Sequence, residues 1–197
     1  MRPSAQRCRS MSELVAFLGL MDSGKSALAL QMHHSLGGEG VLLTSGSRDG
    51  VGLISSRVGL RAPAREVSAD LDLYDLLAAF VDRKRPHYVI ADEVQFYTEK
   101  QVNHLADAVD GLDLSVYAFG LRTDFRGELF PGSKRLLELA DRVENLPVKT
   151  LCWCGREATH TARVRDGVMV LTGDLVEVGD MDSYQNLCRR HHRAGLA

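Results

Sequence analysis

Short apolar runs alternate with longer segments of helix-forming composition through the first three quarters of the chain. The apolar runs predict strands at residues 14–18, 41–44, 87–91, 115–119 and 141–146. The segments between them predict helices at residues 24–36, 68–81, 98–109 and 133–140. Because strands that alternate with helices build parallel sheets, we expect an α/β fold with helices on both faces of the sheet.

Two stretches depart from this alternation. The segment from Ser45 to Val67 is rich in Gly, Ser and Arg and predicts a mobile loop. The composition changes again at Pro147, and beyond it Asp166-Gly167 predicts the turn of a hairpin. The predicted organisation is a disordered leader over residues 1–12, a main domain over 13–147 and a small lobe over 148–197.

Composition and charge narrow the possible functions. The 197 residues are 45% hydrophobic, which is enough for the core of one domain with a small lobe. The formal net charge of -2 provides no basic field for a nucleic-acid backbone, so we expect no nucleic-acid partner. No apolar run approaches the ~18 residues of a membrane span, so we expect no membrane partner and a cytoplasmic location. Either Met1 or Met11 fits as the first residue of the protein.

A glycine-rich turn follows the first predicted strand and opens the first predicted helix. It fits the phosphate-binding pattern G-x-x-x-x-G-K-[ST], whose backbone N–H groups and helix N-terminus face phosphate oxygens. We expect Lys25 to reach the β- and γ-phosphates of ATP, Ser26 to bind Mg²⁺ and Asp22 to point away. The predicted nucleotide-binding residues are Gly19, Leu20, Met21, Asp22, Ser23, Gly24, Lys25 and Ser26. The α/β fold is therefore expected to be P-loop NTPase-like.

Two adjacent carboxylates end the third predicted strand. Apolar residues that lead into Asp92 are typical of the acidic segment that holds Mg²⁺ in P-loop proteins. Glu93 is a candidate for the base that takes the proton of a sugar hydroxyl during phosphoryl transfer. Because strand residues alternate between the two faces of a sheet, we expect these carboxylates to diverge.

Three of the four cysteines lie in the last 46 residues, and histidines follow the last of them. Cys152, Cys154, Cys188 and His191 form a Cys₃His set suited to a structural Zn²⁺ ion, with His192 as an alternative to His191. A fully ligated zinc ion has no open position for catalysis. We expect it to stabilise a lobe that is too small to fold well alone.

These motifs together resemble the type II (cytosolic-type) thymidine kinase family. The resemblance rests on the motifs G-x-M-x-S-G-K-S at residues 19–26, D-E-x-Q-F at 92–96, G-L-R-T-D-F-R-G-E-L-F at 120–130, C-x-C-G-R-x-A at 152–158 and C-R-x-H-H at 188–192, together with Tyr184. It implies transfer of the ATP γ-phosphate to the 5′-hydroxyl of thymidine, in pyrimidine deoxynucleoside salvage. It also implies a homotetramer, with dTTP as feedback inhibitor.

The resemblance also implies roles for individual residues. Glu93 corresponds to the proton acceptor, and Phe125 to the aromatic residue that stacks on thymine. A second nucleotide-contacting segment corresponds to Asp92, Glu93, Val94 and Gln95. The implied thymidine-binding residues are Met21, Leu121, Phe125, Phe130, Thr161, Val176, Val178, Gly179 and Tyr184. The family usually carries an acidic residue before the arginine that matches Arg48, where this chain has Gly46 and Ser47, so we assign no role to that loop.

Three alternatives remain open at this stage. Another P-loop NTPase, such as a nucleotide-driven switch, would need the guanine-binding motif N-K-x-D, which the chain lacks. A zinc-containing nucleic-acid-binding protein conflicts with the acidic net charge. A kinase that prefers deoxyuridine would differ only in the space around the base.

Overall fold

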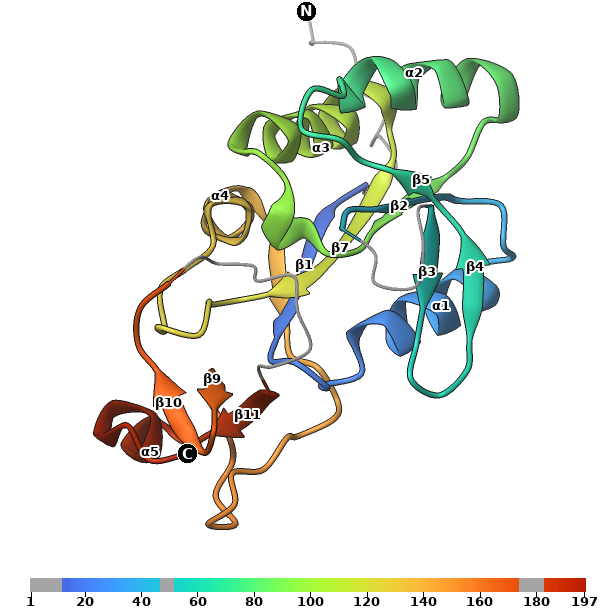
Figure 1. Cartoon of the computed structure of the whole chain (residues 1–197). Coiled ribbons are helices and arrows are strands. Elements are labelled where there is room, and N and C mark those ends of the chain that lie inside the picture. Colours follow the sequence, from blue (N-terminus) through green and yellow to red (C-terminus); the bar gives the residue numbers. More distant parts are fainter. Residues whose placement is uncertain (1–11, 47–51, 174–182) are drawn as a thin grey trace, which may run out of the picture.

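The computed structural model describes residues 12–46, 52–173 and 183–197, and its main element is a six-stranded sheet (Figure 1). Every strand of this sheet is parallel to its neighbours. Along the sheet the order is β5 (Arg65–Glu66), β2 (Val41–Thr44), β6 (Tyr88–Ala91), β7 (Ser115–Leu121), β1 (Leu14–Gly19) and β8 (Arg142–Glu144). The predicted parallel α/β sheet is confirmed.

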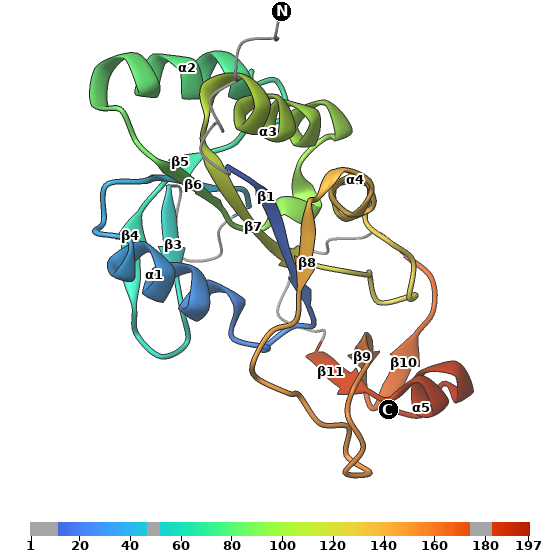
Figure 2. The same cartoon turned by 180° about the vertical axis from the view of Figure 1, so that it is seen from behind.

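Helices cover both faces of this sheet, also as predicted (Figures 1 and 2). One face packs against α2 (Leu73–Lys84), α3 (Glu99–Leu112) and α4 (Pro131–Leu139). The other face packs against α1 (Lys25–Ser35) and a hairpin of β3 (Leu53–Ser55) and β4 (Arg61–Pro63). Successive residues of β1 contribute to the hydrophobic cores on the two faces of the sheet. Leu14 and Ala16 face α2–α4, whereas Val15 and Phe17 face α1.

The predicted loop from Ser45 to Val67 is wrong at residues 53–55, 61–63 and 65–66, which form β3, β4 and β5. The hairpin of β3 and β4 packs on the sheet through Ile54, a buried residue between half-buried neighbours. One buried residue in a short strand leaves no apolar run for sequence analysis to detect. Residues 47–51 of the predicted loop lie outside the described residues.

Most predicted helices and strands match the structure to within a few residues, with one shifted helix. The helix predicted over 68–81 begins instead at Leu73 and ends at Lys84. Asp72 precedes its first turn, and the Asp72 carboxylate accepts a hydrogen bond from the backbone N–H of Asp75. This N-cap, rather than the apolar pattern, sets the start of α2.

The C-terminal part forms a separate three-stranded antiparallel sheet beyond the carboxyl ends of the parallel strands (Figure 2). Its strand order is β10 (Val168–Val170), β9 (His160–Arg165) and β11 (Ser183–Leu187), and α5 (Arg189–Ala194) follows. The hairpin predicted at Asp166-Gly167 joins β9 to β10, and both turn residues have positive φ. We refer to residues 148–173 and 183–197 as the C-terminal lobe. Its boundary with the main domain stays a prediction.

Two remaining expectations concern the N-terminus and membranes. Residues 1–11 of the predicted leader lie outside the described residues. Across the described ranges, none of the helices combines the length and the apolar character needed to cross a membrane.

Candidate functional site

The phosphate-binding motif lies where β1 ends and α1 begins, as its sequence context predicts. Gly24 has a φ of 79°, and a Cβ atom at Gly19 would overlap the side chain of Leu146. The left-handed backbone at Gly24 therefore favours glycine, and a side chain at Gly19 would have to displace that of Leu146. The amine of Lys25 is buried and donates to the carbonyl of Leu20 at 2.6 Å, while the hydroxyl of Ser23 donates to the same carbonyl at 2.8 Å.

Asp22 is turned to the outside of this loop. Its carboxylate lies 2.9 Å from the guanidinium of Arg57, which belongs to the turn between β3 and β4. Both side chains are well exposed, so the pair contributes little to stability. This direction agrees with the expectation that the carboxylate faces away from the phosphates.

The acidic pair lies beside the loop, because Ser26 contacts Asp92. The hydroxyl of Ser26 donates to one carboxylate oxygen of Asp92 at 2.8 Å, and the other oxygen accepts from the N–H of Glu93 at 3.0 Å. The Glu93 carboxylate accepts a hydrogen bond from the side-chain amide of Gln95 instead. The two carboxylates diverge as predicted, but not through strand alternation. β6 ends at Ala91, and Glu93 takes a left-handed conformation with φ 55°.

The environment of Asp92 raises the pKa of its carboxyl above the ordinary value for aspartate. Burial and, next, the charge of Glu93 raise the pKa of Asp92 to about 6. The hydrogen bond from Ser26 and the charge of Lys25 act in the opposite direction. A divalent cation at Asp92 would favour the charged form.

Gln95 connects this acidic pair to the end of β7. It is buried, and it donates to Glu93 while its carbonyl oxygen accepts the N–H of Leu121 at 2.9 Å. A Cβ atom at Gly120 would lie 2.7 Å from that oxygen, so the contact depends on a glycine there. The resemblance implied a nucleotide contact for Gln95. The structure adds its hydrogen bonds to Glu93 and Leu121, which the sequence could not predict because Gln95 and Leu121 are far apart along the chain.

Among the residues implied in thymidine binding, Phe125 lies where the segment after β7 meets the C-terminal lobe. Phe125 is buried, and the guanidinium of Arg163 lies over its ring at 4.1 Å. Phe130 is also buried and packs edge-on against Phe96, with ring centroids 6.0 Å apart. Tyr184 on β11 is 38% exposed. Val176, Val178 and Gly179 lie outside the described residues, so their implied contacts stay a prediction.

Sequence analysis missed Arg163, the largest fully buried side chain in the described part of the chain. Its guanidinium lies between the rings of Phe125 and Tyr184, at 4.1 and 5.9 Å from their centroids. Arg163 and Thr161 are two positions apart on β9 and so share one face of the strand. This two-residue spacing from Thr161 could have indicated that Arg163 faces the same site. A charged residue in a strand more often faces water, however.

Asp124 organises the turn that carries Phe125. It is buried, and one carboxylate oxygen accepts the backbone N–H groups of Arg126 and Glu128 at 2.9 and 3.0 Å. The other oxygen accepts the guanidinium of Arg126 at 2.8 Å. These bonds hold the segment in place, a local role that the motif alone did not reveal.

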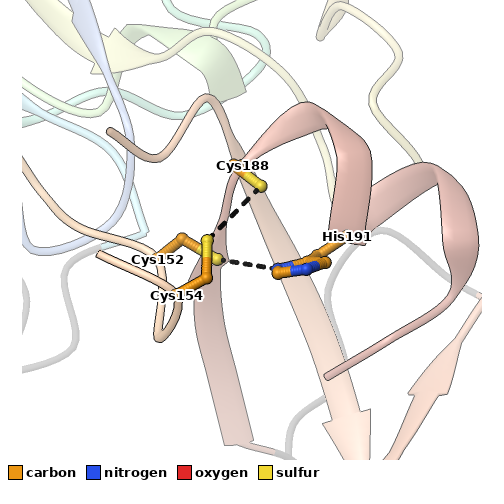
Figure 3. A group of neighbouring side chains, drawn as sticks. All are labelled: Cys152, Cys154, Cys188 and His191. Carbon is orange, nitrogen blue, oxygen red and sulfur yellow. Dashed lines mark hydrogen bonds between the residues drawn. The ribbon is translucent and has the colours of Figure 1, made fainter. Parts of the chain in front are cut away.

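Four side chains in the C-terminal lobe converge in the arrangement of a metal site (Figure 3). The ligand atoms of Cys152, Cys154, Cys188 and His191 all lie within 4.8 Å of one another. The Cys152 sulfur is 3.3 Å from Nδ1 of His191, and the sulfurs of Cys154 and Cys188 are 4.0 Å apart. Ligands around tetrahedral zinc are roughly 3.3–3.9 Å apart, so the cluster is compatible with Zn²⁺.

The protonation state of Cys152 suits a metal ligand. Burial opposes ionisation, but backbone N–H groups of Cys154 and Cys188 and the ring of His191 outweigh it and lower the pKa of Cys152 to about 6. A thiolate at neutral pH is the form that binds zinc.

The structure distinguishes the two candidate histidines. His191 belongs to the cluster, and the Trp153 ring stacks on it with centroids 4.1 Å apart. His192 is buried and lies elsewhere, with Nε2 2.9 Å from the carbonyl oxygen of Phe125 and its ring stacked on His160. His191 is therefore the fourth candidate ligand, and His192 joins the C-terminal lobe to the Phe125 segment.

Comparison with known proteins agrees with this geometry. The family model described as "Thymidine kinase" matches residues 12–192. The chain belongs to the thymidine kinase family. It is 53% identical to a thymidine kinase of Cutibacterium acnes, covering 94% of this chain and 90% of that protein. It is 52% identical to a thymidine kinase of Streptomyces coelicolor (93% and 89%) and 38% identical to one of Streptococcus pyogenes (92% and 97%). The resemblance predicted from the motifs is confirmed.

Proposed function

We propose that this protein transfers the γ-phosphate of ATP to the 5′-hydroxyl of thymidine, giving dTMP. The observation that carries the proposal is the contact between Ser26 and Asp92. It brings the phosphate-binding loop and the acidic pair to one point, with Glu93 directed to a different partner. Membership of the thymidine kinase family supports this function over the other P-loop and nucleic-acid-binding alternatives.

The nucleotide is proposed to bind along the loop from Gly19 to Ser26. Backbone N–H groups and the N-terminus of α1 would face the phosphate oxygens, and Lys25 would exchange its contact with the Leu20 carbonyl for the β- and γ-phosphates. Ser26 and Asp92 supply the hard oxygen ligands that Mg²⁺ prefers. When bound there, Mg²⁺ would neutralise charge on the transferring phosphates.

Glu93 is proposed to accept the proton of the 5′-hydroxyl. Its carboxylate is held by the amide of Gln95, whereas that of Asp92 is held by Ser26, so it has a defined direction of its own. A carboxylate placed within hydrogen-bonding distance of the hydroxyl orients the nucleophile and removes its proton as the phosphoryl group arrives.

The nucleoside is proposed to lie between the end of β7 and the C-terminal lobe. Phe125 would stack on the thymine, and Phe130 would contribute a second aromatic wall. The remaining proposed contacts are Met21, Leu121, Thr161, Val176, Val178, Gly179 and Tyr184. Deoxyuridine is a possible second substrate, because it differs from thymidine only by the methyl group.

The other proposed partners follow from the family. Cys152, Cys154, Cys188 and His191 would hold a structural Zn²⁺ ion that fixes the C-terminal lobe. A homotetramer, feedback inhibition by dTTP and a cytoplasmic location stay predictions.

A nucleoside panel tests the function. The purified protein is incubated with ATP, Mg²⁺ and either thymidine, deoxyuridine or deoxycytidine, and monophosphates are separated by chromatography. We expect dTMP as the main product and no turnover by Lys25→Ala at an unchanged circular dichroism spectrum. A wild-type protein that phosphorylates none of the three would contradict the proposal. Near-normal turnover by Lys25→Ala would remove the loop from the mechanism.

A further inference from the structure

A closed ring of three hydrogen bonds joins the phosphate-binding loop to the C-terminal lobe. The backbone N–H of Met21 lies 3.3 Å from the hydroxyl oxygen of Thr161 on β9. That hydroxyl lies 2.9 Å from the side-chain carbonyl oxygen of Asn186 on β11. The side-chain amide nitrogen of Asn186 lies 2.8 Å from the backbone carbonyl oxygen of Met21, which closes the ring.

The chemistry of the three groups fixes the direction of every bond. The N–H of Met21 can only donate, so the hydroxyl of Thr161 accepts it and passes its single proton to Asn186. The carbonyl of Met21 can only accept, so the amide of Asn186 donates to it. The orientation of the Asn186 amide is thereby determined, with its oxygen toward Thr161 and its nitrogen toward Met21. An aspartate at 186 would lack the donor, and a valine at 161 would lack the hydroxyl.

The fold presents both side chains to Met21 from one surface. Thr161 and Asn186 are directly opposed in the antiparallel pair of β9 and β11. Arg163 and Tyr184 are opposed two positions along the same pair and therefore lie on the same face. The ring thus connects the loop to the face of the lobe that carries Arg163, beside Phe125.

We infer that Asn186 is a positioning residue that couples the ATP site to the nucleoside site by holding the backbone of Met21 against the C-terminal lobe. This inference rests on the proposed function, in which the loop binds phosphates and this face of the lobe borders the base. Met21 belongs to both proposed sites, and the ring holds both its N–H and its C=O. Asn186 itself touches neither substrate in this scheme.

The coupling has a thermodynamic cause. When ATP orders the loop around its phosphates, the ring also orders Thr161 and Asn186, so thymidine binds to a lobe that is already fixed. The effect is reciprocal, because thymidine must then strengthen ATP binding by the same factor. Couplings of this kind typically correspond to a change of about 5–150-fold in affinity.

Calorimetry on the full-length protein tests the inference. The Kd of thymidine is measured with and without a non-hydrolysable ATP analogue and Mg²⁺, and the ratio of the two values is the coupling factor. We expect the wild type to bind thymidine about fivefold or more tightly with the analogue present. Asn186→Ala and Thr161→Val should each bring this ratio close to 1. Gln185→Ala, an exposed neighbour on β11 opposite Ala162, should leave the ratio unchanged.

Two further measurements separate coupling from general damage. Zinc content and Tm report the integrity of the lobe, and hydrogen exchange at the Met21 amide reports the ring itself. Thr161→Val should speed exchange at Met21 while zinc content stays normal. Asn186→Asp keeps the acceptor for Thr161 and loses the donor to Met21, so it breaks the ring with little change in volume. The double variant Thr161→Val/Asn186→Ala should lose no more coupling than the stronger single variant, because one break opens the ring.

Two outcomes would overturn the inference. One is a wild-type coupling factor in Thr161→Val despite faster exchange at Met21, or in Asn186→Asp with normal zinc content. The other is a double variant whose loss equals the sum of the single losses. In either case the wild type would still phosphorylate thymidine, and the proposed function would stand. Absence of turnover by the wild type would instead contradict the proposed function.

Discussion

At the scale of single residues, two adjacent carboxylates have different hydrogen-bond partners, which suits the separate roles proposed for them. Asp92 is buried against Ser26, whereas Glu93 is directed to Gln95 by a left-handed backbone conformation. Sequence analysis predicted the two roles from the motif and predicted the divergence for an incorrect reason. The left-handed conformation of Glu93 follows directly after the end of β6. The residue types in the motif do not predict this conformation.

The substitution Glu93→Gln tests the proposed base. It keeps the size of the side chain and a hydrogen bond to Gln95, but it removes the basic oxygen. We expect kcat to fall by about 10²–10⁴-fold with little change in the Kd of thymidine or ATP. Single-turnover kinetics and calorimetry measure the two quantities. Glu99→Gln, an exposed residue at the start of α3, is the matched control. A Glu93→Gln variant that retains most of its kcat, with chemistry rate-limiting, would exclude Glu93 as the base.

The raised pKa of Asp92 predicts a pH-dependent gain in stability for Asp92→Asn. The carboxyl ionises near 3.8 in the unfolded chain and near 6 in the folded protein, so the folded state binds its proton more tightly. Stability is therefore lost as pH rises from 3.8 to about 6 and stays reduced above 6. In magnesium-free buffer Asp92→Asn should raise Tm by a few degrees at pH 7.5 and by nothing near pH 4. A constant difference in Tm across this range would contradict the assignment.

At the scale of elements, local sequence signals predicted the regular part of the fold. Strands β1, β6 and β7 are buried apolar runs and were predicted within one or two residues. β3 and β4 were missed because Ile54 is the one fully buried side chain between them. The contacts of Arg163 and Asn186 could not be predicted, since each joins residues that are far apart in sequence and depends on strand register.

The start of α3 offers a test of the local signals. Thr98 and Gln101 form a capping box, in which the Thr98 hydroxyl accepts the N–H of Gln101 and the Gln101 side chain accepts the N–H of Thr98. Thr98→Ala removes one of these bonds and should lower the free energy of unfolding by about 1 kcal/mol. Denaturant unfolding measures the change, and the Kd values for both substrates should stay constant. Thr172→Ala, at an exposed position outside regular structure, should have almost no effect. Equal effects of the two substitutions would rule out the cap as the cause.

At the scale of the whole molecule, the C-terminal lobe is joined to the parallel sheet at separate points around the proposed nucleoside site. Thr161 and Asn186 hold Met21, His192 contacts the carbonyl of Phe125, and Arg163 covers its ring. The lobe has a small apolar core that includes Cys152 and Cys188 themselves. The candidate metal ligands are therefore part of the core that positions these contacts.

Zinc loss should therefore affect the two substrates unequally. We expect elemental analysis to find one zinc ion per chain in the wild type and none in His191→Gln, because His191 is the fourth candidate ligand of the cluster. His192→Gln is the matched control, because the His192 ring lies against the carbonyl oxygen of Phe125 and outside the cluster, so zinc should stay bound. Without zinc the core of the lobe loosens, so His191→Gln should lower Tm by more than Thr98→Ala does. It should also raise KM for thymidine more than KM for ATP, because the phosphate-binding loop lies on the sheet. A zinc-free variant with wild-type Tm and KM values would show that the lobe is held by its apolar core alone.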